Sequence, residues 1–377
     1  MNLSDSRLSD IRLMPAPVDH FVRPRASVGF GVGLRGRKAS GGGRASGGGR
    51  ASDGIPKGEV ASGGAGEGDG QPEPEMSFPF FWYEPPWHEA TPRRCRLVGD
   101  LVGGFGILVG ALRHELSDAE AGDDGEYAWP RMAVQRCDRL GWSLEDGQTA
   151  KVVELRLGMD RDESGGYSYP RLLAERLLGD RQENGAGDAT PPIPLLFPPE
   201  WESLSQMRSK VLQWRHLGST AIYVSCDQWH LCEVMAAASV ARADGVIIRY
   251  ADDPVAAMAW YHQWASTAGD VWRPRVWLAG GKMTAEDAVK CLALGASAIS
   301  IDWICDSWLR GDNGPELTLA ERAIMNLGGQ VTQTPEQRLA TDVRRRLGQW
   351  TDSVGRVLQS LFVSHVSELG LKHLVRP

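Results

Sequence analysis

The chain has 377 residues, of which 42% are hydrophobic, and its formal net charge is −7. This length accommodates one large domain or two small ones, and the acidic balance argues against nucleic acid as a partner of the folded part. The longest apolar stretches are interrupted by glycine or charge, and residues 2–12 are polar, so we expect no membrane span and no secretory signal; the expected location is the cytoplasm.

Residues 1–76 are predicted to be a disordered tail. The sequence GGGRAS occurs twice in succession, at 41–46 and 47–52, and the tract stays rich in Gly, Ser and Glu up to Glu75. Such a composition cannot bury enough apolar surface to offset the entropy of the chain. The early part of the tract is basic, which leaves an RNA-binding arm as the alternative to a plain flexible tail, and we favour the tail.

Beyond the tail, short apolar strands alternate with helices. The aromatic and proline-rich stretch 77–89 is expected to pack as an extended segment on the domain surface. Strands are predicted at 150–158, 193–197, 221–226, 244–250, 276–279 and 298–301, and helices at 169–178, 202–217, 231–240, 255–265, after 284 and at 335–369. This alternation is the signature of a βα-repeat fold. The glycines of 99–112 do not form a dinucleotide-binding fingerprint, since Val109 stands at the third glycine position.

The most informative stretch is 273–305, which reads as strand, glycine turn, helix, glycine and strand. Gly280 and Gly281 allow a sharp turn, and Thr284 suits the N-cap of the following helix. In barrel enzymes, a glycine turn at the carboxyl end of a strand can cradle a phosphate group with backbone N–H groups. An ordinary βα turn is the alternative.

Several charged residues near strand ends are candidate ligands. Arg249 is expected to point toward the barrel mouth, where it could bind an anion or pair with Asp252 or Asp253. The two adjacent acids are read as a solvated turn rather than a metal site. His230 and Cys232 are read as helix-face residues because no further histidine is near in sequence. We expect no metal site.

Taken together, these segments resemble the FMN-binding barrel domain of glutamate synthases. The segment 279–298 resembles the family's GG-x-x-T-x-x-D motif followed by LGA, 150–158 resembles its strand ending IEIKL, and 244–254 resembles its DFI-x-ID-x-A-D segment. The resemblance spans about 95–310. It implies a (β/α)8 barrel, FMN as cofactor, and cofactor contacts from Gly280, Gly281, Lys282 and Asp252, with Arg249 as the anion-binding residue.

The sequence departs from that family at several expected contacts. Asp302 and Trp303 replace the second phosphate turn, and the lysine expected on the strand 221–226 has no counterpart. Trp277 and Trp303 are expected to fill space that a flavin would otherwise take. Cys305 alone remains of three cluster cysteines, so no iron–sulfur cluster is expected.

The sequence therefore predicts a (β/α)8 barrel, complete or abbreviated, with a tail at 1–76, a barrel domain at 77–325 and a C-terminal helical extension at 326–377. The resemblance implies an oxidoreductase acting on CH–NH2 donors, which forms glutamate from 2-oxoglutarate and ammonia. The missing contacts favour a degenerate member with weak or no activity. The alternatives are an active FMN-dependent oxidoreductase with a rebuilt site and a non-redox, anion-binding or regulatory barrel. Catalytic residues are not assigned, and a protein partner is left open.

Overall fold

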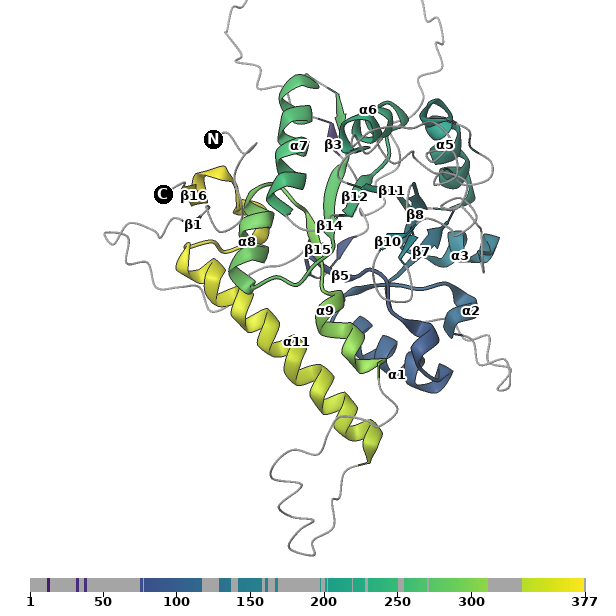
Figure 1. The fold of residues 1–377 in the computed structure, drawn as a ribbon, viewed down its shortest axis with the longest axis vertical. Helices are drawn as coiled ribbons and strands as arrows, with labels where there is room; N and C mark the ends of the chain where they lie inside the picture. Colours follow the sequence, from purple (N-terminus) through teal and green to yellow (C-terminus); the bar gives the residue numbers. More distant parts are fainter. Residues whose placement is uncertain are drawn as a thin grey trace, which may run out of the picture.

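A computed structural model describes residues 78–116, 129–136, 142–157, 197, 201, 203–218, 220–227, 230–249, 254–269, 271–310 and 334–375, with short pieces at 12–13, 32–33, 37–38, 75–76, 160–161 and 167–168. Its centre is a closed barrel of eight strands (Figure 1). Each strand runs parallel to its neighbours, and β15 pairs with β5 to close the ring. The fold is therefore a complete (β/α)8 barrel, as the sequence predicts.

The barrel strands are short and fully buried, as parallel strands covered by helices must be. They are β5 (Phe80–Trp82), β6 (Leu108–Gly110), β7 (Arg131–Gln135), β8 (Val152–Arg156), β11 (Ala221–Asp227), β12 (Gly245–Arg249), β14 (Arg275–Ala279) and β15 (Ala298–Ser300). The remaining strands are two-residue pieces in separate pairs: β1 (Arg12–Leu13) with β16 (Leu374–Val375), β2 (Val32–Gly33) with β4 (Glu75–Met76), β3 (Arg37–Lys38) with β13 (Trp272–Arg273), and β9 (Asp160–Arg161) with β10 (Tyr167–Ser168).

Side chains alternate along the strands between two cores, since successive residues of a strand point to opposite faces. One core fills the barrel and is dominated by aromatic rings, with Trp277 at 4.9 Å from Phe81 and 4.1 Å from Tyr223 between ring centroids. The other lies between strands and helices. Gly245 makes room for the inner core, because a Cβ placed there would lie 1.9 Å from a ring carbon of Tyr223.

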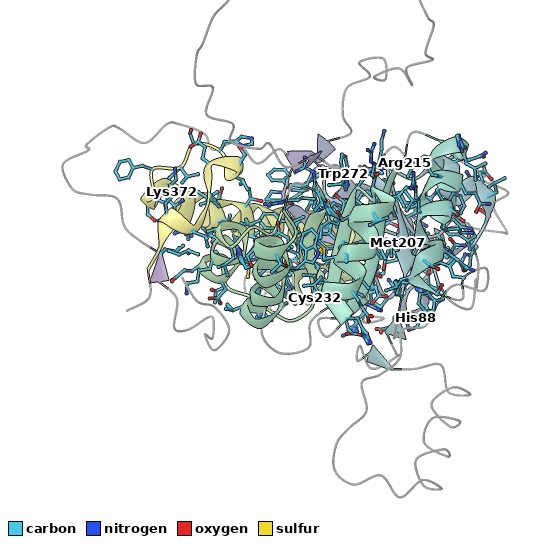
Figure 2. The ribbon with its side chains drawn as sticks, turned by 90° about the horizontal axis from the view of Figure 1, so that it is seen from above. His88, Met207, Arg215, Cys232, Trp272 and Lys372 are labelled. Atoms are coloured by element: carbon cyan, nitrogen blue, oxygen red, sulfur yellow. The ribbon has the colours of Figure 1, made fainter. Side chains whose placement is uncertain are left out.

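Helices surround the barrel and connect successive strands (Figure 1). They are α1 (Pro92–Gly103), α2 (Arg113–Leu116), α3 (Leu144–Thr149), α5 (Met207–Leu217), α6 (Leu231–Ala241), α7 (Pro254–Thr267), α8 (Ala285–Ala293), α9 (Asp302–Cys305) and α11 (Pro335–Ser360), with 3-10 turns η2 (Trp87–Glu89), η3 (Leu204–Gln206), η5 (Asp306–Trp308), η6 (Val366–Glu368) and η7 (Leu371–His373). The long helix α11 packs against α8 and α1. Figure 2 shows α5 from above, with Met207 at its start and Arg215 in its last turn, where Arg215 pairs with Asp244 at 3.1 Å.

Most predicted elements are confirmed, but two predictions are wrong. The segment 77–89 is not a surface segment, since it contains β5, whose residues are 0–1% exposed. The aromatic residues of β5 are buried core residues of the first barrel strand. The C-terminal helix ends at Ser360 rather than at 369, because Phe362 adopts the left-handed conformation with φ of 54°. The helix predicted at 169–178, the segment 193–196 and the domain boundary at 325 lie outside the described residues.

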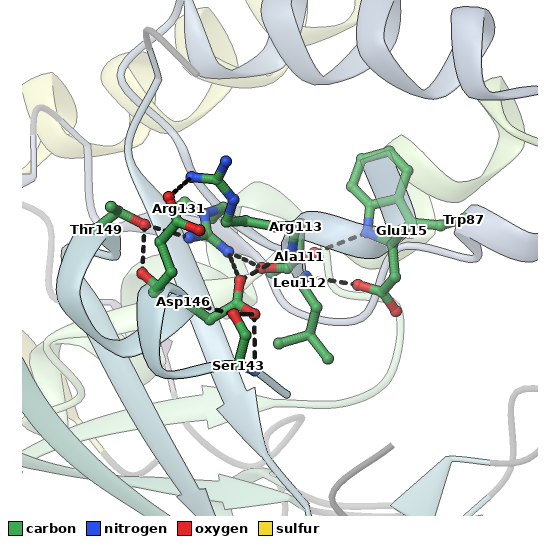
Figure 3. A network of polar contacts seen from close by, with 11 residues as sticks. Trp87, Ala111, Leu112, Arg113, Glu115, Arg131, Ser143, Asp146 and Thr149 are labelled. Atoms are coloured by element: carbon green, nitrogen blue, oxygen red, sulfur yellow. Dashed lines mark hydrogen bonds and ion pairs between the residues drawn. The ribbon is translucent and has the colours of Figure 1, made fainter. Parts of the chain in front are cut away.

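A buried ion pair fixes the short connections on one side of the barrel (Figure 3). Arg131 of β7 and Asp146 of α3 lie 2.5 Å apart and are 4% and 0% exposed. Arg131 also donates to the carbonyl of Ala111 and the hydroxyl of Thr149, and Asp146 accepts from the backbone N–H of Arg113. The pair therefore joins β7 to the segments that follow β6 and β7, with its hydrogen bonds satisfied.

The close contact between Gly245 and the Tyr223 ring predicts that a larger residue at position 245 destabilises the barrel. Replacing Gly245 with Ala should lower the free energy of unfolding by about 1–3 kcal/mol, because the new methyl group overpacks the inner core against Tyr223. Urea denaturation of both proteins measures the difference. Gly348→Ala in α11 is the matched control, since a Cβ there meets nothing within 4 Å and should leave stability unchanged or slightly raised. Equal stability of both variants would contradict the packing described here.

Candidate functional site at the barrel mouth

Charged and polar side chains gather at the carboxyl ends of the barrel strands, where active sites of this fold lie. They belong to the segments that end β5, β8, β11, β12 and β15, and all are buried: Tyr83, Glu84, Glu154, Arg156, Ser225, Asp227, Arg249 and Ser300. Such a concentration of polar groups in a barrel otherwise filled by apolar side chains requires mutual hydrogen bonding. This group of residues is called the mouth cluster below.

Glu154 and Arg156 form the centre of the mouth cluster. The Arg156 Nε lies 3.0 Å from Glu154 Oε1, its Nη2 lies 3.2 Å from Oε2, and its Nη1 contacts Glu84. Glu154 Oε1 also accepts from the Tyr83 hydroxyl at 2.6 Å and the Ser225 hydroxyl at 2.5 Å. Burial acts to raise the pKa of Glu154, but the charge and hydrogen bonds of Arg156, with the two hydroxyl donors, bring it below its ordinary value.

The charged residues of the mouth cluster act on the pKa of the Tyr83 hydroxyl. The Tyr83 ring has the Arg156 guanidinium carbon 5.1 Å from its centroid. Burial raises the pKa of Tyr83 well above its ordinary value; Arg156 and Arg249 act against that rise, and the two glutamates act with it. Tyr83 therefore stays protonated and donates its hydrogen to Glu154.

Asp227 and His230 form a second pair, where β11 ends and α6 begins. The His230 Nδ1 lies 2.9 and 2.8 Å from the two carboxylate oxygens of Asp227, which also accepts from the His230 backbone N–H at 3.1 Å. Burial acts to raise the pKa of Asp227, and the hydrogen bonds and charge of His230 lower it below its ordinary value. The pair fixes the imidazole at the N-cap of α6, two residues before Cys232, which Figure 2 labels. The helix-face interpretation of His230 missed this contact.

Arg249 ends β12 and is 4% exposed. It lies in register with Asp227 of β11 on one side and with Ala279 of β14 on the other. Its Nη2 reaches across β11 to the carbonyl oxygen of Leu157, just beyond β8. The guanidinium is thus held inside the mouth, as predicted from its position at the strand end.

Two of the predicted phosphate contacts lie beside Arg249. Gly280 follows Ala279 directly, with φ of 155°, and its N–H donates to the Ser300 hydroxyl of β15 at 3.2 Å. Gly281 and Lys282 are exposed at the same corner. Helix α8 then begins at Ala285 after its N-cap Thr284, as predicted, and Thr284 forms a capping box with Asp287. A backbone N–H, a serine hydroxyl and a lysine are a donor set that suits a phosphate group.

The structure changes the interpretation of Asp302 and Trp303. The Asp302 Oδ1 accepts from the Tyr83 backbone N–H at 2.7 Å, so the carboxylate is engaged toward β5. The Trp303 ring packs against Trp350 of α11, with centroids 5.7 Å apart, and so contacts the helical layer. Trp277 lies inside the barrel and is 0% exposed. The aromatic partner of Trp303 is thus supplied by α11, and a role for Trp303 in filling flavin space stays a prediction.

Asp252 falls outside the described residues, so its predicted role stays a prediction. Glu154, Arg156 and Tyr83 were not predicted as site residues, although a charged pair two residues apart inside the apolar strand 150–158 is a visible signal for the first two. Within the described part of the chain, no group of three or more His, Cys, Asp or Glu side chains is arranged to hold a metal ion, and no helix has the length and apolar character needed to cross a membrane.

Sequence comparisons give no relatives: no family model matches the chain, and no curated protein matches it. Solved structures do match. Mandelate oxidase with (S)-2-phenylpropionate superposes with a TM-score of 0.51 at 12% identity, over 99% of this chain and 89% of the other. A mandelate oxidase variant with (S)-mandelic acid gives 0.52 at 12% over 99% and 89%, and a variant with a C4a-OH-FMN adduct gives 0.51 at 12% over 97% and 87%.

At this level of identity, the likeness to mandelate oxidases establishes the fold alone. It agrees with the closed barrel described above over nearly the full chain. The neighbours named here are not glutamate synthases, so the resemblance to that family gains no support from them.

The Glu154–Arg156 pair predicts an acid-sensitive barrel. Because the pKa of Glu154 is lower in the folded protein than in the unfolded chain, its contribution to stability is present above the unfolded pKa and is lost as pH falls through the folded pKa. Glu154→Gln should remove this part of the pH dependence, and Arg156→Met should cost roughly 3–5 kcal/mol near pH 7, because it leaves a buried carboxylate unpaired. Urea denaturation as a function of pH measures both effects.

The matched control is the exposed ion pair of Arg93 and Glu336, whose side chains are 80% and 52% exposed. Glu336→Gln should change stability by less than about 1 kcal/mol. A similar small effect of Arg156→Met would show that the buried pair is not important for stability.

Proposed function

We propose that the protein is an FMN-dependent oxidoreductase with a rebuilt site, acting on a small anionic substrate at the carboxyl end of the barrel. The observation that carries this proposal is the adjacency of Arg249 to the hydrogen-bonded pair of Gly280 and Ser300, across neighbouring strands of the mouth. The barrel architecture supports it, since solved proteins of similar fold carry an FMN adduct or bind mandelic acid.

The phosphate of FMN would be held at the β14–β15 corner. The Gly280 and Gly281 N–H groups, the Ser300 hydroxyl and the Lys282 ammonium are all donors. The charge of Asp302 opposes phosphate binding, and its Oδ1 is directed toward β5 by the hydrogen bond that it accepts from the Tyr83 backbone N–H. The donor set of this corner therefore suits the cofactor.

The resemblance to glutamate synthases implies a lysine on β11, and arginines on the neighbouring strands could take its place in this chain. Ser225 stands in β11, and arginines flank it on both neighbouring strands, Arg156 in β8 and Arg249 in β12. When bound, a flavin would accept two electrons from the substrate carbon in the form of a hydride. Arg156 is held by Glu154 and Glu84. Arg249 ends β12 beside the Gly280 corner, and we assign the anionic group of the substrate to it because of that position.

His230 is the residue we assign to proton transfer. Asp227 holds the Nδ1 side of the imidazole, which orients the ring so that its Nε2 can accept a proton. The substrate proton would move to His230 while Arg249 holds the anionic group in place. Arg249 ends β12, and His230 is hydrogen-bonded to Asp227, the last residue of the neighbouring strand β11, so the two strand ends set the spacing between them.

The second candidate function is that of a degenerate glutamate synthase that no longer binds flavin. The hydrogen bond from the Gly280 N–H to the Ser300 hydroxyl favours this second candidate, because the bond occupies an N–H group that was predicted to bind the phosphate. The two candidates differ in whether the corner exchanges that bond for a phosphate oxygen.

Flavin titration tests the phosphate corner. The protein should bind FMN at least about a hundredfold more tightly than riboflavin, which lacks the phosphate, since two charge-assisted hydrogen bonds contribute roughly 3 kcal/mol. Quenching of flavin fluorescence gives both affinities. Lys282→Glu should reduce the preference, and Lys151→Glu, an exposed lysine at the amino end of β8, should not. Equal affinity for the two flavins would refute this assignment.

The proton-transfer role predicts a kinetic defect. His230→Gln should slow the reduction of bound flavin by a 2-hydroxy carboxylate roughly 10²–10⁴-fold, because a positioned general base contributes about that much. Stopped-flow absorbance of the flavin measures the rate, and FMN affinity should stay unchanged. His216→Gln, an exposed histidine of α5, is the control. An unchanged reduction rate would exclude His230 from the chemistry.

A further inference from the structure

A basic surface lies outside the barrel mouth, where α1, η5 and the first half of α11 meet (Figure 1). We define this arginine face by the segments 87–96, 306–310 and 334–346. These segments contain eight arginines against four carboxylates, a net charge of +4 in a chain of net charge −7. The arginines are Arg93, Arg94, Arg96, Arg310, Arg338, Arg344, Arg345 and Arg346.

Hydrogen bonds between the elements hold this face together. The Arg94 Nε donates to the Trp308 carbonyl at 2.7 Å, and the Trp308 indole donates to Asp342 at 3.0 Å. Asp342 in turn contacts Arg345 and lies 2.9 Å from the Arg346 Nε. The side chains of α1 and α11 are therefore anchored on one shared centre, and the face is a fixed surface rather than a set of unrelated charges.

Much of this positive charge is accessible to solvent. The side chains of Arg93, Arg310, Arg345 and Arg346 are 80%, 45%, 54% and 43% exposed, and Arg344 is also exposed. Two of the four carboxylates, Asp306 and Asp342, are only 7% and 13% exposed. The cations thus face outward and part of the compensating charge lies beneath them.

We propose that the arginine face binds an acidic segment of a partner protein. Arginine suits individual carboxylates because its planar fork can bind both oxygens. Carboxylates lie among the arginines, with Glu336 at 2.6 Å from Arg93 and Glu89 at 3.2 Å from Arg310, so these two guanidinium groups already bind carboxylates, the group that an acidic segment would present. This surface is independent of the flavin site and of its chemistry.

Binding of labelled poly-L-glutamate to the full chain tests the proposal, measured by fluorescence anisotropy. The protein should bind this probe, and the affinity should fall as salt is raised above 0.1 M, where the Debye length is about 10 Å. The combined variant Arg344→Gln, Arg345→Gln and Arg346→Gln should weaken binding at least about tenfold. Arg93→Gln with Arg96→Gln, on the other element of the face, should act in the same direction.

The matched control replaces three exposed basic residues elsewhere, Lys151, Arg208 and Lys372, with glutamine and should bind like the parent. Circular dichroism confirms that each variant is folded. The proposal is overturned if the parent does not bind the probe, if the control weakens binding as much as the face variants, or if a single-stranded oligonucleotide of equal charge binds more tightly than poly-L-glutamate.

Discussion

The buried pair of Glu154 and Arg156 is the constraint on which the barrel mouth depends. Both groups are at most 1% exposed, and each charge at that depth requires a partner. They connect three strands, because Glu154 accepts from Tyr83 after β5 and from Ser225 in β11, and Arg156 binds Glu84. The pair therefore fixes the positions of the Tyr83 and Ser225 hydroxyls and of the Glu84 carboxylate, which are its hydrogen-bond and ion-pair partners.

The two buried arginines of the mouth are held in different ways. Arg156 is surrounded by two carboxylates, while Arg249 crosses β11 to a backbone carbonyl at the top of the cluster. The arrangement places Arg249 next to the Gly280 corner and across from the Asp227–His230 pair. A rigid inner core of Phe81, Tyr223 and Trp277 supports these strand ends from below. The mouth is thus held by strands, which suits the positioning of a reacting group.

Much of the fold could be predicted from sequence, because local signals carry it. The glycine turn at 280–281, the Thr284 cap and the apolar runs of β11 and β12 are each readable within a few residues. The first strand was not recognised, since its aromatic and proline-rich surroundings resemble a surface segment. The mouth cluster could not be predicted because Tyr83 and Glu154 meet only when the barrel closes, 71 residues apart in sequence. The direction taken by Trp303 likewise depends on α11, whose packing no local pattern specifies.

The most direct test of the account is the visible absorbance of the purified protein, with the released flavin identified and quantified after denaturation. The rebuilt site described here predicts a flavin spectrum, stoichiometric FMN after denaturation, and reconstitution when FMN is added to the stripped protein. A colourless protein that takes up no added FMN would contradict it and would leave a barrel whose mouth is closed by its own ion pairs.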